Sequence, residues 1–357
     1  MVSVIVPARN EEASLGACLE SLVAQTDVRF EIIVVDDGST DRTRDVAQSF
    51  PGLRVVDPGP LPPGWSGKNN ALVAGAKEAQ GAWLLFTDAD TVHRAGSLAG
   101  SLAEARRRGA ALLSYSPGQE VHGFWEKAVM PVIFAELAST YRPSEVSDPT
   151  SFAAAANGQY ILISREAYEA VGGHAAVAAS LLEDVDLARA VKASGRKIFF
   201  RYGGDEVRTR MYRSFAQLSE GWTKNLALLF RSPVRLAVLR LTEFVLIVGS
   251  GAVAFLMGLR GRTQASVAVG MLAVILAAFL ARRIRKAHFS WDADVLAVIG
   301  LPVFSYLLLR SRIAHRKGTI SWKGRLYAGS RDPATSDEVR AGHRREAGAR
   351  SQHATSN

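Results

Sequence analysis

The stretch FEIIVVDDGSTD at residues 30–41 decides the fold. Its first half is a β-branched apolar run that predicts a buried strand, and Ser39 or Thr40 can cap a helix that follows. The same order occurs at the N-terminus, where an apolar run at 2–6 precedes apolar residues at helical spacing over 11–24. Two successive strand–helix units predict a parallel sheet whose ligand site lies beyond the carboxyl ends of the strands.

The rest of the N-terminal region continues this pattern. Further strands are expected at residues 53–56, 82–87, 111–115, 159–164 and 197–202, the last of which is expected to be the final strand. Further helices are expected at residues 68–79, 129–141, 165–171 and 183–193, of which the second belongs to the core or lies on a membrane. The predicted fold class is α/β, a Rossmann-like, mainly parallel sheet with flanking helices, followed by transmembrane or interfacial helices.

The C-terminal part of the chain is much more apolar. Runs at residues 236–259 and 264–281 approach the roughly 20 residues that cross a bilayer. A third run at 295–309 is shorter and contains Pro302, so it is expected to span obliquely, to re-enter or to lie in the interface. A full third span would export the basic tail, which favours a re-entrant or interfacial segment. The alternative interpretation is a buried soluble helix, and the basic cluster at 282–286 argues against it.

These runs predict how the chain is divided. The expected parts are a catalytic domain at 1–232, a membrane region at 233–310, a juxtamembrane segment at 311–329 and a disordered polar tail at 330–357. The N-terminus shows no signal peptide, so we expect the catalytic domain to lie in the cytoplasm. We expect the protein to be a multi-pass protein of the inner (plasma) membrane.

Charge and cysteine content narrow the possible partners. The net charge is +9, and much of the positive charge lies late, beside apolar runs, which favours a membrane surface and argues against nucleic acid. The single cysteine, Cys18, excludes an intrachain disulfide and is expected to fill the core.

Two carboxylates follow the apolar run WLLF at residues 83–86. Asp88 and Asp90 are separated by one small residue at the end of a predicted strand, where they can hold Mn or Mg against phosphate oxygens. A solvated turn is the alternative interpretation of such a triplet. Its position after a buried strand favours a metal site.

A second acidic pair ends an earlier strand. Asp36 and Asp37 are expected along the same crevice, where a carboxylate can accept hydrogen bonds from a base or a ribose. A helix cap is the alternative for this pair. Lys68, at a helix start, is expected to reach a phosphate, unless it is simply solvated.

Two later groups are candidates on the acceptor side. Glu183 and Asp184 open a helix, where a carboxylate can serve as the base that removes a proton from an acceptor hydroxyl, or simply favour the helix dipole. Arg210 and Arg213 precede Trp222 beside the membrane region. These three residues are expected to bind diphosphate or acceptor, or to anchor the domain at the interface.

Five motifs in order resemble the family 2 glycosyltransferases with the GT-A fold. They are VIVPARNE at 4–11, VVDDGSTD at 34–41, GK at 67–68, TDAD at 87–90 and ED at 183–184. The order and spacing match over roughly the first 230 residues. In addition, GWSGK at 64–68 and WKGRLY at 322–327 resemble the membrane-associated branch that includes carotenoid- and hopanoid-associated glycosyltransferases.

The resemblance implies a nucleotide pocket. Pro7, Arg9 and Glu11 would line it, and Asp37, with Asp36 nearby, would read the base.

The resemblance also implies the reaction centre. Lys68 would approach the nucleotide, Asp88 would contact ribose or diphosphate, and Asp90 would ligate Mn or Mg. Asp184 would be the base of an inverting displacement. Members that act on membrane substrates often carry Gln-x-x-Arg-Trp, and the nearest match here is RMYRSF at 210–215, so the tryptophan role passes to Trp222 or is absent.

The predicted function is transfer of a sugar from a nucleotide-diphosphate donor, a UDP-sugar first of all, to a lipid or other membrane-associated acceptor. A processive polysaccharide synthase is one alternative, although its pore normally needs more spans than two or three. A non-catalytic nucleotide-sugar-binding scaffold is another, and the carboxylates at Asp88, Asp90 and Asp184 argue against it.

Overall fold

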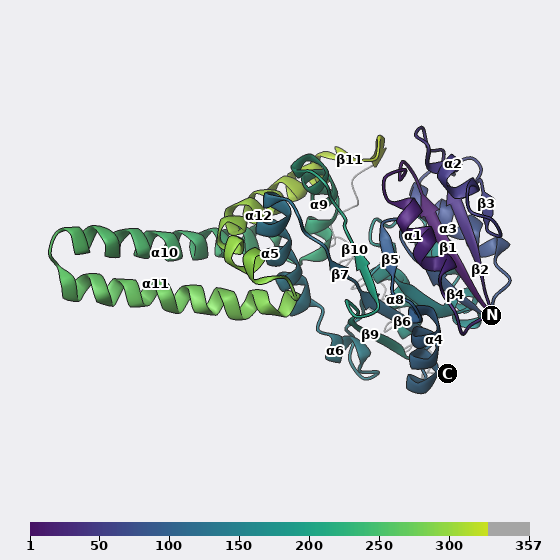
Figure 1. Cartoon of the computed structure of the whole chain (residues 1–357), viewed down its shortest axis with the longest axis horizontal. Coiled ribbons are helices and arrows are strands. Elements are labelled where there is room, and N and C mark those ends of the chain that lie inside the picture. Colours follow the sequence, from purple (N-terminus) through teal and green to yellow (C-terminus); the bar gives the residue numbers. More distant parts are fainter. Residues whose placement is uncertain (328–357) are drawn as a thin grey trace, which may run out of the picture.

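The structure is a computed structural model that describes residues 1–327. The expectation of a polar tail at 330–357 lies outside the described residues. The described part comprises an α/β domain, a block of three packed helices and a long helical hairpin (Figure 1).

The centre of the α/β domain is a seven-stranded sheet with the order β3-β2-β1-β4-β8-β6-β9. Strand β8 is antiparallel to both of its neighbours, and all other neighbouring strands are parallel. The strands are β1 (Val2–Ala8), β2 (Phe30–Asp36), β3 (Arg54–Val56), β4 (Trp83–Phe86), β6 (Leu112–Ser116), β8 (Ile161–Ser164) and β9 (Ile198–Tyr202). The predicted fold class, a mainly parallel sheet with flanking helices, is confirmed.

Helices cover both faces of this sheet (Figure 1). They are α1 (Leu15–Val23), α2 (Thr43–Gln48), α3 (Gly67–Glu78), α4 (Ser97–Arg108), α6 (Pro143–Ser147), α7 (Arg165–Ala170), α8 (Glu183–Ala193) and the 3-10 helix η1 (Gly173–Val177).

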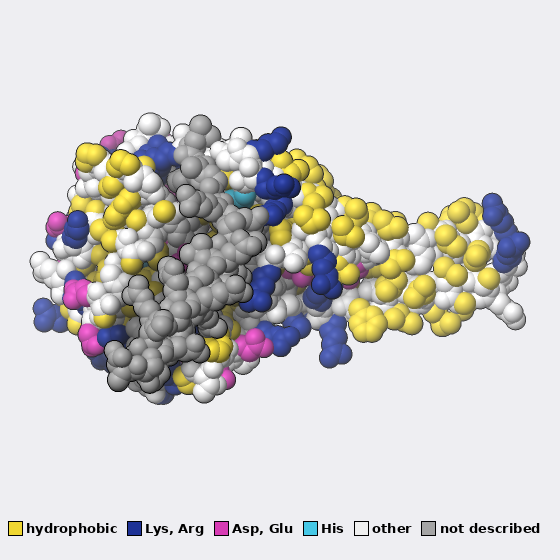
Figure 2. All heavy atoms as spheres, turned by 180° about the vertical axis from the view of Figure 1, so that it is seen from behind, with side chains coloured by type: hydrophobic (Ala, Val, Ile, Leu, Met, Phe, Trp, Pro, Cys, Tyr) yellow, Lys and Arg dark blue, Asp and Glu magenta, His cyan; other side chains and the backbone are white. Residues whose placement is uncertain are grey.

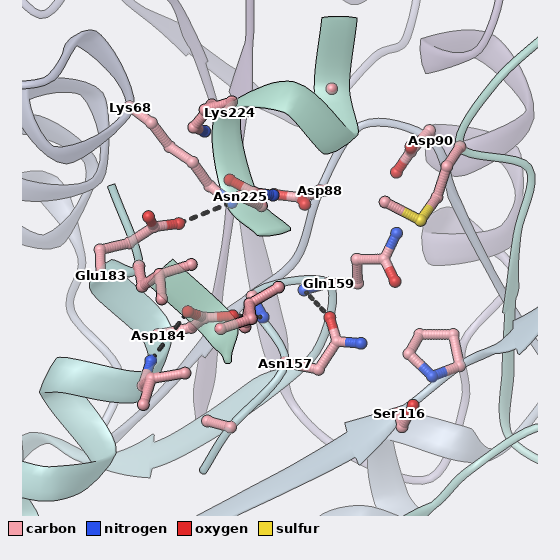
Figure 3. A pocket seen from close by; sticks show the side chains of 18 of the residues that line it. Lys68, Asp88, Asp90, Ser116, Asn157, Gln159, Glu183, Asp184, Lys224 and Asn225 are labelled. Carbon is pink, nitrogen blue, oxygen red and sulfur yellow. Dashed lines mark hydrogen bonds and ion pairs between the residues drawn. The ribbon is translucent and has the colours of Figure 1, made fainter. Parts of the chain in front are cut away.

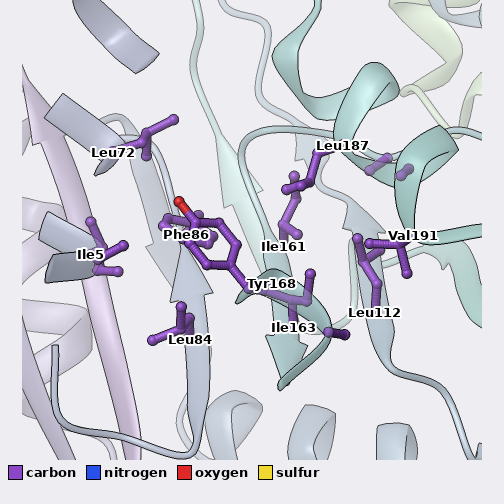
Figure 4. Close-up of a cluster of buried hydrophobic side chains, with 14 of the residues drawn as sticks. Ile5, Leu72, Leu84, Phe86, Leu112, Ile161, Ile163, Tyr168, Leu187 and Val191 are labelled. Atoms are coloured by element: carbon purple, nitrogen blue, oxygen red, sulfur yellow. The ribbon is translucent and has the colours of Figure 1, made fainter. Parts of the chain in front are cut away.

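The β1 side chains alternate between two cores. Ile5 belongs to a cluster with Phe86 and Leu187, part of which is drawn in Figure 4, whereas Val4 belongs to the cluster on the opposite face. This period of two is the geometry of a strand buried on both sides. Cys18 is fully buried in the second cluster, as expected for core filler.

Several short strands were not expected. A three-stranded sheet contains β5 (Thr91–His93), β7 (Gly118–Gln119) and β10 (Val207–Thr209), and a late hairpin contains β11 (Ile320–Trp322) and β12 (Arg325–Tyr327). The expectation that residues 197–202 form the last strand is therefore wrong. Strands of two or three residues are too short to show a periodic pattern.

A third core joins the α/β domain to the apolar C-terminal region. It is formed by α5 (Phe124–Thr140), α9 (Phe215–Leu229) and α12 (Trp291–Lys317). Helix α5 begins before the expected residue 129 because Glu126 accepts hydrogen bonds from the backbone N–H groups of His122 and Gly123 and so caps its start.

Helices α10 (Pro233–Leu259) and α11 (Thr263–Ile284) form a hairpin that extends away from the rest of the molecule (Figure 1). Hydrophobic side chains cover its surface in Figure 2, and basic side chains lie at its tip and around its base. Both helices are long and apolar enough to cross a membrane, and little of either is buried in the protein. These are the properties expected for the first two apolar runs.

Helix α12 differs from this hairpin. It is also long and apolar enough to cross a membrane, but 44% of its most apolar window is buried in the protein, against 11% and 6% for α10 and α11. Near its start Asp292 forms an ion pair with Lys127 of α5 at 2.6 Å, and near its end Arg310 donates to Ser219 of α9 at 2.9 Å. Both ends of α12 therefore rest on the helices that adjoin the catalytic domain.

A cluster of four charged side chains joins α5 to the base of the hairpin. Arg240 and Arg283 lie 2.9 and 3.2 Å from the same oxygen of Glu136, and each lies 2.7 Å from Glu243. All four side chains are at least four-fifths buried, so each charge depends on its opposite neighbours for stabilisation.

Candidate active site

A cavity of about 710 Å³ lies at the carboxyl ends of β1, β2 and β4 and extends to the α5, α9 and α12 block. Pro7 and Arg9 reach it from the end of β1, Asp37 from the end of β2, and Asp88 from the end of β4. This is the edge at which a parallel sheet places its ligand site. The part around Lys68 and Asp184 is shown in Figure 3.

Most of the residues predicted for the site line this cavity. They are Pro7, Arg9, Glu11, Asp37, Lys68, Asp88, Asp90, Glu183, Asp184 and Trp222. The structure thus brings together five motifs that are spread over residues 4–184 of the sequence.

Asp36, Arg210 and Arg213 are not among the residues that line the cavity. Asp36 is buried at the end of β2, where it accepts a hydrogen bond from the backbone N–H of Ser39 at 3.1 Å and so shapes the turn.

The two arginines are held by other partners. The guanidinium of Arg210 donates two hydrogen bonds to Glu126 at the start of α5, at 3.1 and 3.3 Å. Arg213 donates to the carbonyl of Ala13 at 3.2 Å. Both side chains tie segments of the domain together rather than face the cavity.

Lys68 joins the two acidic motifs. Its Nζ lies 2.8 Å from Oδ1 of Asp88 and 2.9 Å from Oε1 of Glu183. Burial alone would lower the pKa of Lys68, but the charges of these two carboxylates outweigh it and raise the pKa well above its usual value. Burial alone would raise the pKa of Glu183, and the Lys68 and Lys224 charges outweigh it and lower the pKa. Glu183 is thus an ionised structural partner of Lys68.

Asp184 has a different environment from its neighbour. Its carboxylate accepts hydrogen bonds from the backbone N–H groups of Gly158 at 2.9 Å and Val185 at 2.8 Å. Burial and the adjacent Glu183 charge raise the pKa of Asp184 to about 6. A carboxylate with this pKa is ionised at neutral pH and is a stronger base than an ordinary aspartate.

The environment of Asp90 suits a cation. Its Oδ1 atom is inaccessible to solvent and has no hydrogen-bond partner in the described part of the chain. Burial and the charges of Asp88 and Glu11 raise the pKa of Asp90 to about 7. Residues 1–327 contain no group of three or more metal-binding side chains, so Asp88 and Asp90 could supply only part of a coordination shell. Mg²⁺ sites that are completed by substrate phosphates and water have this composition.

Helix α9 supplies cavity residues that were not predicted from the sequence. Lys224 and Asn225 line the cavity beside Asp88 (Figure 3), and Leu229 lines it one turn beyond Asn225. The positions 221, 222, 225 and 229 share one helix face, so helical spacing from Trp222 would have found two of these residues. The Trp222 indole donates to the sulfur of Met130 at 3.3 Å, which fixes its ring against α5.

The wall opposite the acidic cluster is apolar. Phe134, Leu137, Ala138 and Tyr141 follow one face of α5 and line the cavity. The Tyr141 hydroxyl donates to the carbonyl of Leu229 at 2.9 Å and so joins α5 to α9. The cavity also reaches residues 286–288, directly after α11.

The late hairpin lines the cavity beside Asp37 and Glu11. Trp322, Lys323 and Arg325 all line it. The guanidinium of Arg325 forms a two-armed ion pair with Asp37, in which Nη2 lies 3.0 Å from Oδ1. The sequence singled out this motif by resemblance but gave no hint of the segment that it contacts.

Residues 3–171 match the model of the glycosyl transferase family 2. These residues form a family 2 glycosyltransferase domain, and the protein is a glycosyltransferase.

The chain is also similar to curated proteins over almost all of its length. It is 29% identical over 348 residues to the 4,4'-diaponeurosporenoate glycosyltransferase of Staphylococcus aureus strain MRSA252. The match covers 93% of this chain and 89% of the relative. The protein of the same name from strain USA300 is 29% identical over 350 residues, with the same coverage.

Among solved structures, similar chains include two metal-bound glycosyltransferases. The mannosyltransferase PcManGT from Pyrobaculum calidifontis, in complex with GDP-Man and Mn²⁺, has a TM-score of 0.48 and 17% identity, and the match covers 88% of this chain and 86% of that one. Glucosyl-3-phosphoglycerate synthase from Mycobacterium tuberculosis, in complex with Mn²⁺, uridine diphosphate and phosphoglyceric acid, has a TM-score of 0.43 and 22% identity, with 64% and 77% coverage.

Proposed function

We propose that this family 2 glycosyltransferase transfers a sugar from a nucleotide-diphosphate donor, UDP-linked in the first instance, to a lipid acceptor in the membrane, by metal-assisted inversion. The observation that carries the proposal is the lining of the cavity. It combines the acidic cluster with an apolar face of α5 and with residues 286–288 at the base of the α10–α11 hairpin.

The donor end suits a nucleotide diphosphate. Asp88 and Asp90 would hold Mn²⁺ or Mg²⁺ together with the diphosphate oxygens, and the metal would neutralise charge on the departing diphosphate. Pro7, Arg9 and Glu11 line the adjoining wall, where the nucleotide is expected. Asp37 retains its proposed role towards the base, since each carboxylate oxygen can accept more than one hydrogen bond.

The acceptor end suits a long apolar molecule. The α5 face and Leu229 offer apolar surface, and an acceptor that enters beside residues 286–288 would not leave the membrane region. The names of the curated relatives, diaponeurosporenoate glycosyltransferases, support a carotenoid-type carboxylic acid. A hydroxylated lipid would fit the same surface.

Asp184 is the proposed base. The acceptor oxygen forms a bond to the anomeric carbon while the bond from that carbon to the phosphate oxygen breaks. The nucleoside diphosphate leaves with the bond's electron pair, and the proton of an acceptor hydroxyl passes to Asp184. A single displacement of this kind inverts the anomeric configuration. A carboxylate acceptor is ionised at neutral pH and has no proton to give.

The charges around the hairpin support a cytoplasmic catalytic domain. Arg235 lies in the first turns of α10, and Arg282, Arg283 and Arg285 end α11, whereas the tip between these helices carries Arg260 and Arg262. The excess of basic residues at the base favours that side as cytoplasmic. We place α10 and α11 across the plasma membrane and α12 along its inner surface, beside the domain on which both of its ends rest.

The test is transfer to lipid. The purified full-length chain is incubated with Mn²⁺, radiolabelled nucleotide sugars and a lipid extract of the source cells, and the labelled product is identified by mass spectrometry. Label in a lipid product supports the proposal. Label that enters only water-soluble polymer would favour a polysaccharide synthase instead.

A further inference from the structure

The turn of the late hairpin carries a lysine in an unusual backbone conformation. Lys323 and Gly324 are the two residues between β11 and β12, and both have positive φ angles, 45° and 76°. A two-residue turn of this kind favours Asn-Gly, because both central residues need positive φ angles and asparagine and glycine adopt them more readily than other residues. Lys323 therefore occupies a position that local backbone preference does not explain, and such residues are frequent at functional sites.

The Lys323 side chain lies at the nucleotide end of the cavity. Its Nζ donates to the carbonyl of Arg9 at 3.0 Å and forms an ion pair with Glu11. In the described residues these are its two hydrogen-bond partners, which leaves the third N–H of the ammonium for a ligand. Asp90 lies near enough for the Lys323 charge to act on its carboxylate. The ammonium is thus beside the carboxylates proposed to hold the metal.

The hairpin is tightly seated over this site. Arg325 pairs with Asp37 and passes directly over Gly67 at the start of α3, where an added Cβ would lie 1.8 Å from its Nη1 atom. Position 67 therefore needs glycine because the Arg325 guanidinium lies so close to its backbone, and not because a turn requires it. On the other side, Trp322 lies against Lys224, with the ammonium 5.5 Å from the ring centroid.

We infer that Lys323 is a donor-binding residue whose ammonium contacts the diphosphate of the nucleotide sugar, and that Arg325 positions it by fixing the hairpin to Asp37. The inference rests on the proposed donor class. A mobile, solvated lysine would need neither the left-handed backbone nor a hairpin that Arg325 fixes above Gly67. Lys323 contacts Arg9 and Glu11, which line the wall where the nucleotide is proposed to bind, so the phosphate that Lys323 meets belongs to the donor.

The test replaces Lys323 by residues that separate charge from backbone. Lys323→Asn suits the turn and removes the ammonium, whereas Lys323→Arg keeps a cation. The matched control is Lys317→Asn, which removes an exposed lysine from the last turn of α12. Affinity for UDP and for GDP with Mn²⁺, and for uridine without phosphate, is measured by titration calorimetry on the full-length chain in detergent, with the unfolding temperature alongside.

Lys323→Asn is expected to weaken diphosphate binding about tenfold or more, to leave uridine binding unchanged, and to keep or raise the unfolding temperature. Lys323→Arg is expected to stay within about threefold of the unaltered chain, and Lys317→Asn to match it. Diphosphate affinity that is unchanged in Lys323→Asn would overturn the inference, as would an equal loss for uridine. An unaltered chain that binds neither UDP nor GDP would refute the proposed function, and the inference with it.

Discussion

Oδ2 of Asp184 accepts a hydrogen bond from the backbone N–H of Gly158 at 2.9 Å, while the neighbouring Glu183 is paired with Lys68. Two adjacent carboxylates at the start of one helix thus have different partners. Backbone N–H groups hold the orientation of the Asp184 carboxylate, and burial and the Glu183 charge raise its pKa by more than the Lys68 charge and these hydrogen bonds lower it. This relationship supports Asp184, rather than Glu183, as the proposed base.

Asp184→Asn tests that assignment. With a hydroxyl acceptor we expect kcat to fall by roughly 10²- to 10⁴-fold while donor affinity stays unchanged, because the amide cannot take the proton. With a carboxylate acceptor the loss should be much smaller. Asp45→Asn, an exposed position on α2, is the matched control. Full turnover of a hydroxyl acceptor by Asp184→Asn would show that another group is the base.

The pH profile gives a second test of the same residue. The base must be ionised, and the pKa of Asp184 is raised to about 6, so kcat with a hydroxyl acceptor should rise through about pH 6 and level off above it. Measurements at saturating donor and Mn²⁺ separate this ionisation from metal binding. Glu183→Gln removes the neighbouring negative charge and should move the midpoint to lower pH. A midpoint that stays fixed in this variant would contradict the assignment.

Metal dependence tests Asp90. We expect EDTA to abolish turnover and excess Mn²⁺ to restore it, and we expect Asp90→Asn to lose about 100-fold or more of the Mn²⁺-dependent rate. Direct Mn²⁺ binding, measured by electron paramagnetic resonance, should weaken in parallel. Undiminished turnover of Asp90→Asn in EDTA would show that the reaction needs no metal ion.

The charged cluster at the base of the hairpin predicts non-additive stability. Arg283→Met leaves Glu136 and Glu243 short of a cation and should cost about 3 kcal/mol. Arg283→Met combined with Glu243→Met leaves the Arg240–Glu136 pair and should recover much of this loss. The free energies of unfolding of the unaltered chain, both single variants and the double variant, measured in detergent, give the coupling energy between Arg283 and Glu243. Simple additivity would mean that the four residues act independently.

The placement of the membrane helices is tested by thiol labelling. In a Cys18→Ala background, Gly261→Cys lies at the hairpin tip and Lys317→Cys at the end of α12. An impermeant maleimide added to intact cells should label only the first, since both ends of α12 rest beside the domain that we propose to lie in the cytoplasm. Labelling of Lys317→Cys from outside would mean that α12 crosses the membrane.

The sequence predicted the parts of the fold that local pattern determines. The apolar runs that end at Asp37 and Asp88 were recognisable as buried strands, and parallel strands bring their carboxyl ends to one edge. The reversed direction of β8 is not visible in a four-residue apolar run. Hydropathy also cannot show whether α12 is covered by lipid or by protein, since both are apolar surroundings.

The site was predictable where a motif is contiguous. The contact of Arg210 with Glu126 could not be predicted, because Glu126 lies 84 residues away and closeness to Trp222 in sequence says nothing about which way the Arg210 side chain points. The role of Lys323 was inaccessible for the same reason, because it contacts Glu11 across 312 residues. The position of Lys323 depends on how α12, which precedes the late hairpin, packs on α5 and α9.

The most direct measurement of the central claim follows labelled sugar between two phases. Proteoliposomes that contain the purified chain and the source lipids are given the active labelled donor with either Mn²⁺ or EDTA. A parallel sample contains Asp90→Asn in place of the unaltered chain. After extraction, the radioactivity of the organic phase is counted. The account predicts label in the organic phase only for the unaltered chain with Mn²⁺, with inverted anomeric configuration in the isolated product. Label that stays in the aqueous phase, or that enters lipid equally in EDTA, would contradict it.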